Sequence, residues 1–155
     1  MQIPIQLIVP SHTMKAIDIH ALVDSGADIP CIDWDFFKKH QLPTTKLETS
    51  IWAWNVDNSY NKKEDILYTC TLFLNVEGIA LKTTLHVMAC GQDNVILGLP
   101  WLKAANPSIN WKNCTLSLDK SIDQSTELYS FFAKILTTTT ITIESHLSES
   151  LDMSM

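Results

Sequence analysis

The most informative stretch of this sequence is Ala21-Leu22-Val23-Asp24-Ser25-Gly26-Ala27-Asp28. The apolar run over residues 19–23 predicts a buried strand, and Asp24, Ser25 and Gly26 follow it in a tight turn. A carboxylate at the end of such a strand is suited to activating a water molecule. An Asp-Ser-Gly tripeptide is also a common way to begin a loop, so the rest of the chain must distinguish a catalytic turn from an ordinary one.

Size and charge limit the class of protein. The chain has 155 residues, 46% of them hydrophobic, and a net charge of −6, which fits one globular domain with a tail. The only paired lysines are Lys38-Lys39 and Lys62-Lys63, so we expect no nucleic-acid partner. No apolar run reaches about 18 residues and no signal peptide is evident. The sequence therefore predicts no membrane partner and an intracellular, cytoplasmic location.

The cysteines and histidines are scattered along the chain. Cys31, Cys70, Cys90 and Cys114 form no Cys-x-x-Cys pair and have no histidine at ligand spacing. Reduced, packed thiols are therefore expected, with no metal site and no cofactor. The five histidines are likewise scattered, and none forms a recognisable nucleophile-and-base pattern with a cysteine or serine.

The alternation of apolar residues and the turn-forming residues predict that the body of the chain is mostly β. We expect a hairpin over 3–9 and 16–23, a short helical turn at 36–39, a hairpin with an exposed tip at 51–60, and a hairpin over 66–76 and 79–89 that turns at Glu77-Gly78. A short strand over 94–98, a helix over 99–105 with Pro100 in its first turn, and a strand over 109–118 follow.

The composition changes near Asp119. All four glycines and all six prolines precede it, whereas 13 of the 37 residues in 119–155 are serine or threonine. We therefore expect two parts, a domain over 1–118 and a Ser/Thr-rich C-terminal extension over 119–155. Apolar residues at helical spacing behind a possible cap at Ser125 predict a helix over 125–136 that docks on the body, and the end of the chain is expected to be disordered.

Three separated motifs together resemble the retroviral-like aspartic proteases (retropepsins), and most closely the protease domain of gypsy-type LTR retrotransposon polyproteins. The motifs are residues 21–27, the turn Asn55-Val56-Asp57, and Val95-Ile96-Leu97-Gly98-Leu99-Pro100-Trp101-Leu102 with the following Asn106-Pro107-Ser108-Ile109-Asn110-Trp111. The resemblance covers about residues 2 to 118. It implies a retropepsin-like closed β-barrel, the acid protease fold, with one short helix.

The resemblance also implies a mechanism. Family members carry one Asp-Ser/Thr-Gly per chain, so two chains pair to bring two Asp24 carboxylates together as a dyad that activates water against an extended peptide. Ser25 would bond across the dimer axis, and Gly26 would permit close backbone approach. The resemblance assigns substrate contacts to Ala27, Asp28, Asn55, Val56, Asp57 and Asn58, and support of the site to Ile96, Leu97 and Gly98. The natural substrate would be a polyprotein.

Several residues depart from the family pattern. Asp57-Asn58 stands where Asp-Gly is common at the flap tip, and Leu99 stands where many retroviral enzymes carry an arginine. An alternative reading is therefore a catalytically silent, domesticated domain that is kept for dimerisation or peptide binding. The printed residues hold no capsid-like or reverse-transcriptase segment, so we expect an excised or free-standing domain. Trp101 and Trp111 are expected to pack in the core.

Overall fold

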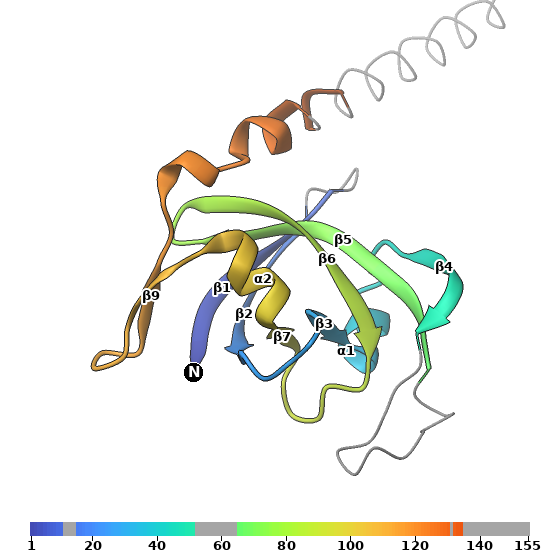
Figure 1. Ribbon diagram of the computed structural model, residues 1–155. Coiled ribbons are helices and arrows are strands. Elements are labelled where there is room, and N and C mark those ends of the chain that lie inside the picture. Colours follow the sequence, from blue (N-terminus) through green and yellow to red (C-terminus); the bar gives the residue numbers. More distant parts are fainter. Residues whose placement is uncertain (11–14, 52–64, 131, 135–155) are drawn as a thin grey trace, which may run out of the picture.

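The computed structural model describes residues 1–10, 15–51, 65–130 and 132–134 (Figure 1). Its strands are β1 (Gln2–Val9), β2 (Lys15–Val23), β3 (Cys31–Asp33), β4 (Thr45–Ile51), β5 (Ile66–Val76), β6 (Ile79–Met88), β7 (Val95–Leu97), β8 (Ser108–Asn110) and β9 (Thr115–Ser117). Its helices are α1 (Trp34–Lys39), α2 (Leu99–Ala105) and the short 3-10 helix η2 (Lys120–Ile122), and residues 125–130 and 132–134 are also helical.

Six strands close into a barrel. They pair in the order β1-β2-β7-β3-β6-β5, and β5 pairs again with β1. One edge of β5 pairs with β6, while its other edge pairs with β4 near Thr69 and with β1 near Phe73. The fold is therefore the mostly β, retropepsin-like barrel that the sequence predicted, with β4 outside the closed ring.

Local sequence explains the main turns and helix ends. At the β5–β6 turn, Glu77 and Gly78 have φ of 50° and 84°, and the Gly78 N–H donates to Asn75 Oδ1 over 2.9 Å. Two positive φ values are the requirement of a type I′ hairpin turn. The α1 helix begins where the Asp33 side chain accepts from Asp35 N and Phe36 N.

The main core lies inside the barrel and beneath its two short helices. Its fully buried members include Leu7, Ile32, Leu72, Leu85 and Leu97, which come from five different strands. Each strand contributes alternate residues, because side chains on a strand point to opposite faces. The body carries two short α-helices where the sequence analysis expected one, since residues 34–39 form a capped helix.

The expected strand over 109–118 is wrong in one respect. The chain instead forms the hairpin β8–β9, in which Ile109 lies opposite Leu116. The Asn110 side chain accepts from Asn113 N over 3.1 Å, and Cys114 has a φ of 52°, so the backbone reverses between them. Trp111 lies in this turn and is 74% exposed, contrary to the expectation that it packs in the core, whereas Trp101 is buried.

The tail helix docks on the outer surface of the barrel, as predicted. Leu128 and Phe132 form a second apolar cluster with Phe73 and Ala80, against which Ile8 packs. The start of the helix differs from the prediction, because Ser125 is not the capping acceptor. Its N–H and hydroxyl both donate to Asp123 Oδ1. Predicted helical positions beyond residue 134 lie outside the described residues.

Candidate functional site

Asp24 lies at the end of two neighbouring parallel strands. Strand β2 pairs with β7 so that Val23 is opposite Leu97, and the loops that begin at Asp24 and at Gly98 leave the sheet side by side. The Asp24 N–H donates to Leu97 O over 3.1 Å, which ties the start of the first loop to the end of β7. The position of Asp24 is thus set by the barrel itself.

The turn after β2 presents a carboxylate to solvent. The Ala27 N–H donates to Asp24 O over 3.1 Å, and the Gly26 N–H donates to Asp24 Oδ1 over 2.9 Å. Asp24, Ser25 and Gly26 are all exposed in the single chain. The backbone of the turn is held by hydrogen bonds, while one face of its carboxylate stays open to a ligand or to a second chain.

Gly98 lies directly behind this loop. A Cβ atom placed on Gly98 would lie 2.6 Å from Ala27 O and 2.8 Å from Ile29 O, which is too close for any side chain. The N–H of the next residue, Leu99, donates to Ala27 O over 2.9 Å. The α2 helix therefore starts in close contact with the back of the Asp24 loop.

The other predicted site residues divide into three groups. Ala27 is half-buried and Asp28 is exposed, both in the loop after β2. Leu97 is fully buried, whereas Ile96 is half-buried on the opposite face of β7, so only Leu97 belongs to the core. Among the described residues no cation lies within ion-pair distance of Asp28. Predicted flap residues Asn55, Val56, Asp57 and Asn58 lie outside the described residues.

The strands that flank the predicted flap are paired with each other. Ile51 at the end of β4 lies opposite Ile66 at the start of β5, and Thr45 lies opposite Thr69. Strands β4 and β5 are therefore antiparallel neighbours, which is the pairing that the two strands of a hairpin require.

One close contact near the site was not predicted from the sequence. The Cys90 thiol donates to Cys31 Sγ over 3.2 Å, although the two cysteines are 59 residues apart. Cys31 begins β3 directly after the loop that contains Asp24, and Cys90 follows β6. The sequence signal that could have suggested the contact is weak, because each cysteine is adjacent to a strand but their pairing depends on the barrel closing.

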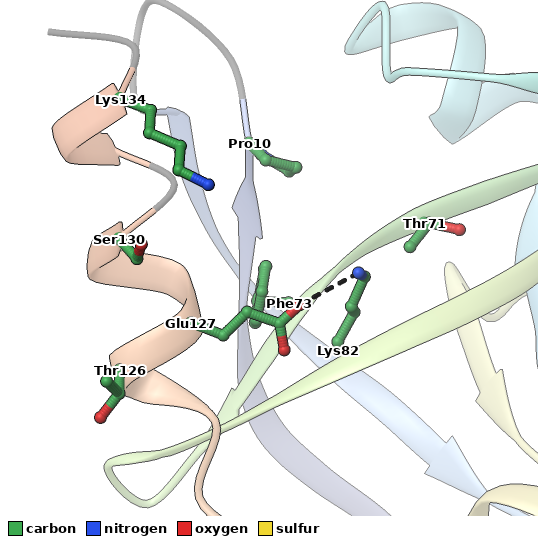
Figure 2. Close-up of a pocket in the computed structure, with 8 residues that line it drawn as sticks. All are labelled: Pro10, Thr71, Phe73, Lys82, Thr126, Glu127, Ser130 and Lys134. Atoms are coloured by element: carbon green, nitrogen blue, oxygen red, sulfur yellow. Dashed lines mark hydrogen bonds and ion pairs between the residues drawn. The ribbon is translucent and has the colours of Figure 1, made fainter. Parts of the chain in front are cut away.

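A cavity of about 560 Å³ lies elsewhere, between the tail helix and the barrel (Figure 2). Lys82 and Glu127 form an ion pair across it, with 3.1 Å between Nζ and Oε1. Its lining residues include Phe73 and Ser130 but neither Asp24 nor any member of its loop. This cavity therefore belongs to the docking of the tail rather than to the Asp24 site.

Within the described part of the chain, no helix is long and apolar enough to cross a membrane.

Comparison with known proteins gives one family match and several structural likenesses. The model of the PEG10/RTL1 protease domain matches residues 20–126, and no curated protein sequence matches. The retroviral protease-like domain of Ddi1 from Leishmania major is 18% identical, covering 79% of this chain and 90% of that chain, with a TM-score of 0.48.

Two viral enzymes are similar at comparable levels. The EIAV protease, solved with the inhibitor HBY-793, is 14% identical, covering 71% of this chain and 91% of its own, with a TM-score of 0.49. The Simian Foamy Virus (mac) protease, solved in solution, is 20% identical, covering 66% of this chain and 96% of its own, with a TM-score of 0.40.

The closed barrel and the Asp-Ser-Gly loop at the end of β2 define a retropepsin-like protease domain. The chain belongs to the PEG10/RTL1 protease domain family, whose model spans the Asp24 loop, α2 and the start of the tail helix. This membership agrees with the resemblance to gypsy-type retrotransposon proteases.

Proposed function

We propose that this protein is an aspartic endopeptidase that cuts extended peptides as a homodimer, with Asp24 from each chain forming the catalytic dyad. The observation that carries the proposal is the Asp24 loop itself. Its backbone is fixed by Leu97 O, and no side chain is tolerated behind it at Gly98, yet its carboxylate is exposed. A rigid, open carboxylate is what a shared two-chain site requires.

The chemistry needs two carboxylates in different protonation states. Two carboxyl groups held a few ångströms apart share one proton, because both cannot be ionised at low cost. The ionised member then accepts a proton from water, and the protonated member donates to the oxygen of the peptide carbonyl. Ser25, next to the dyad, would hold the two loops together across the dimer axis.

The substrate would lie as an extended strand over the Asp24 loop. Ala27 and Asp28 follow the loop at its surface, and residues 55–58 would cover the peptide from the other side. A polyprotein of the kind that retrotransposons encode is the proposed natural substrate, and family membership supports this choice.

The test is cleavage of a mixed peptide library between about pH 4 and 7 by wild type and by Asp24→Asn. We expect the variant to lose at least about 1,000-fold in rate, because it retains the shape of the site but loses the carboxylate. Asp18→Asn is the matched control, because Asp18 is an exposed carboxylate on β2, the strand that leads into Asp24. The Asp18→Asn variant should cleave at the wild-type rate.

Equal cleavage by wild type and Asp24→Asn would rule out the dyad. Absence of cleavage by both proteins, in a sample that is dimeric in solution, would favour the silent domain that serves dimerisation or peptide binding.

A further inference from the structure

We propose that Cys31 and Cys90 form a reversible disulfide when the protein meets a two-electron oxidant such as hydrogen peroxide, which makes this thiol pair a redox modification site behind the Asp24 loop. The inference does not depend on peptidase activity. It rests on the position of the two sulfur atoms, on how firmly each is held, and on the contrast with the other two cysteines.

The two sulfur atoms are already in contact. The Sγ–Sγ distance is 3.2 Å, and a disulfide bond is about 2.05 Å long, so the atoms need to approach by only about 1 Å. No other residue separates them, because the Cys90 thiol donates directly to Cys31 Sγ.

Both cysteines are held by the barrel. Cys31 lies in β3 between two strands, opposite His86 of β6 and Ile96 of β7, and it is 4% exposed. The Cys90 N–H donates to Asp33 Oδ1 over 3.0 Å. The other oxygen of the Asp33 carboxylate caps α1, so Cys90 is fixed to the same part of the molecule as Cys31.

The hydrogen bond also prepares the pair for oxidation. The bond from Cys90 lowers the pKa of the Cys31 thiol below its ordinary value, because it stabilises the thiolate. The same bond, together with burial, raises the pKa of the Cys90 thiol. One sulfur therefore favours the nucleophilic thiolate, while the other retains its proton and is half-exposed.

The reaction balances with peroxide as the only co-reactant. The Cys31 thiolate attacks one peroxide oxygen, the O–O bond breaks, and Cys31 sulfenic acid and hydroxide are formed. The hydroxide takes up the proton that the Cys31 thiol released on ionisation, which gives the first water. The Cys90 sulfur then attacks the sulfenic sulfur, the S–O bond breaks, and the leaving hydroxide takes the Cys90 proton as a second water. Two thiols are oxidised by two electrons and the peroxide is reduced.

The bond would connect two segments that surround the candidate site. Cys31 directly follows the loop over 24–30, and Cys90 lies in the connection from β6 to β7. Leu97, the last residue of β7, accepts a hydrogen bond from Asp24 N. Oxidation would therefore tie the back of the Asp24 loop to the connection that leads into β7.

The other cysteines provide internal references. Cys70 is fully buried, and burial raises its pKa to about 12, so it should not react. Cys114 is exposed and could react with a second chain, so the experiment uses Cys114→Ser. The chain has no arginine, and cleavage after lysine places Cys31, Cys70 and Cys90 on separate peptides, 16–38, 64–82 and 83–103.

Purified full-length Cys114→Ser is treated with hydrogen peroxide, blocked with a thiol reagent, digested with trypsin without reductant and analysed by mass spectrometry. We expect peptides 16–38 and 83–103 to be joined with loss of two hydrogen atoms, peptide 64–82 to stay free, and dithiothreitol to reverse the link. Oxidation should also raise Tm by about 5 °C or more.

The control is Cys90→Ser in the Cys114→Ser background, which should fold because residue 90 is half-exposed. This double variant is expected to lose both the link and the rise in Tm. The proposal is overturned if peptides 16–38 and 83–103 remain unlinked in folded, peroxide-treated protein, or if Cys90→Ser shows the same rise in Tm.

Discussion

Gly98 offers a direct test at the scale of one residue, because its α-carbon faces backbone oxygens rather than a side chain. In Gly98→Ala the new Cβ would lie 2.6 Å from Ala27 O and 2.8 Å from Ile29 O. Neither oxygen can move without displacing the loop that contains Asp24. We expect the substitution to lower the free energy of unfolding by about 3 kcal/mol, measured by urea unfolding.

Gly26→Ala is the comparison for Gly98→Ala. Here the nearest atom to the new Cβ is Asp24 Oδ1 at 3.2 Å, which belongs to a side chain that can rotate away. Stability should change by less than about 1 kcal/mol. Equal loss of stability in both variants would show that the tight packing behind the loop is not specific to Gly98.

At the same scale, the contact between Cys31 and Cys90 could not be predicted from the sequence. Cys31 and Cys90 are far apart in the chain and carry no motif, so the sequence favoured separate, reduced thiols. Their contact arises because β3 lies between β6 and β7, so that the connection from β6 to β7, which contains Cys90, passes β3.

At the scale of elements, Asp123 anchors the tail helix to β6. Its Oδ1 accepts from the Ser125 hydroxyl over 2.7 Å and from the Ala80 N–H over 2.9 Å. The Ser125 bond and then the Ala80 bond lower the pKa of the Asp123 carboxyl below its ordinary value of 3.8. Gln124 extends the contact, because its side chain accepts from Lys82 N over 2.7 Å.

This lowered pKa predicts a pH-dependent contribution to stability. Because the folded-state pKa of Asp123 lies below the unfolded-state value, its contribution is complete above pH 3.8 and is lost as the pH falls through the folded-state pKa. Asp123→Ala should therefore unfold at lower urea than wild type at about pH 7, and the two midpoints should converge below pH 3.8.

Ser125→Ala provides the control for Asp123→Ala. It removes the hydroxyl donor and leaves the Ala80 bond, so it should reduce the pH-dependent difference only in part. A constant gap between wild type and Asp123→Ala at every pH would show that the carboxylate charge contributes nothing to docking.

Most elements could be predicted from local patterns. The β1–β2 and β5–β6 hairpins and α2 follow from alternation, from the Glu77-Gly78 turn and from Pro100. The β8–β9 hairpin was missed because its turn depends on an Asn110 side-chain bond and on a positive φ at Cys114, a residue type that seldom adopts one.

At the scale of the whole molecule, the described residues form two apolar clusters of unequal extent. The main cluster includes Leu116, is contacted by Leu118, and has no member from the tail, while the second joins Leu128 and Phe132 to the outer face of β5 and β6. The tail therefore covers a completed barrel. The Asp24 loop, in contrast, leaves its carboxylate on the surface, where a second chain can reach it.

The placement of the candidate site was predictable only in part. Residues 21–28 indicated a carboxylate at a strand end, but the contact between its loop and Gly98 depends on β2 and β7 being parallel neighbours. Val23 of β2 and Leu97 of β7, which are 74 residues apart in the sequence, become neighbours only when the barrel closes. The sequence therefore predicted this contact through family resemblance alone.

A two-chain site makes a quantitative prediction for mixed dimers. If wild type and Asp24→Asn are mixed in equal amounts, unfolded and refolded together, chains that pair at random give about one quarter wild-type dimers. Every mixed dimer lacks one carboxylate, so cleavage at fixed total protein should fall to about one quarter of the wild-type rate, not to about one half.

Asp18→Asn, mixed and refolded in the same way, should leave the rate unchanged, because its exposed carboxylate lies on β2 away from the loop. A rate of about one half in the Asp24→Asn mixture would mean that each chain cleaves independently. One Asp24 carboxylate would then suffice, and the shared dyad would be excluded even if the protein were dimeric in solution.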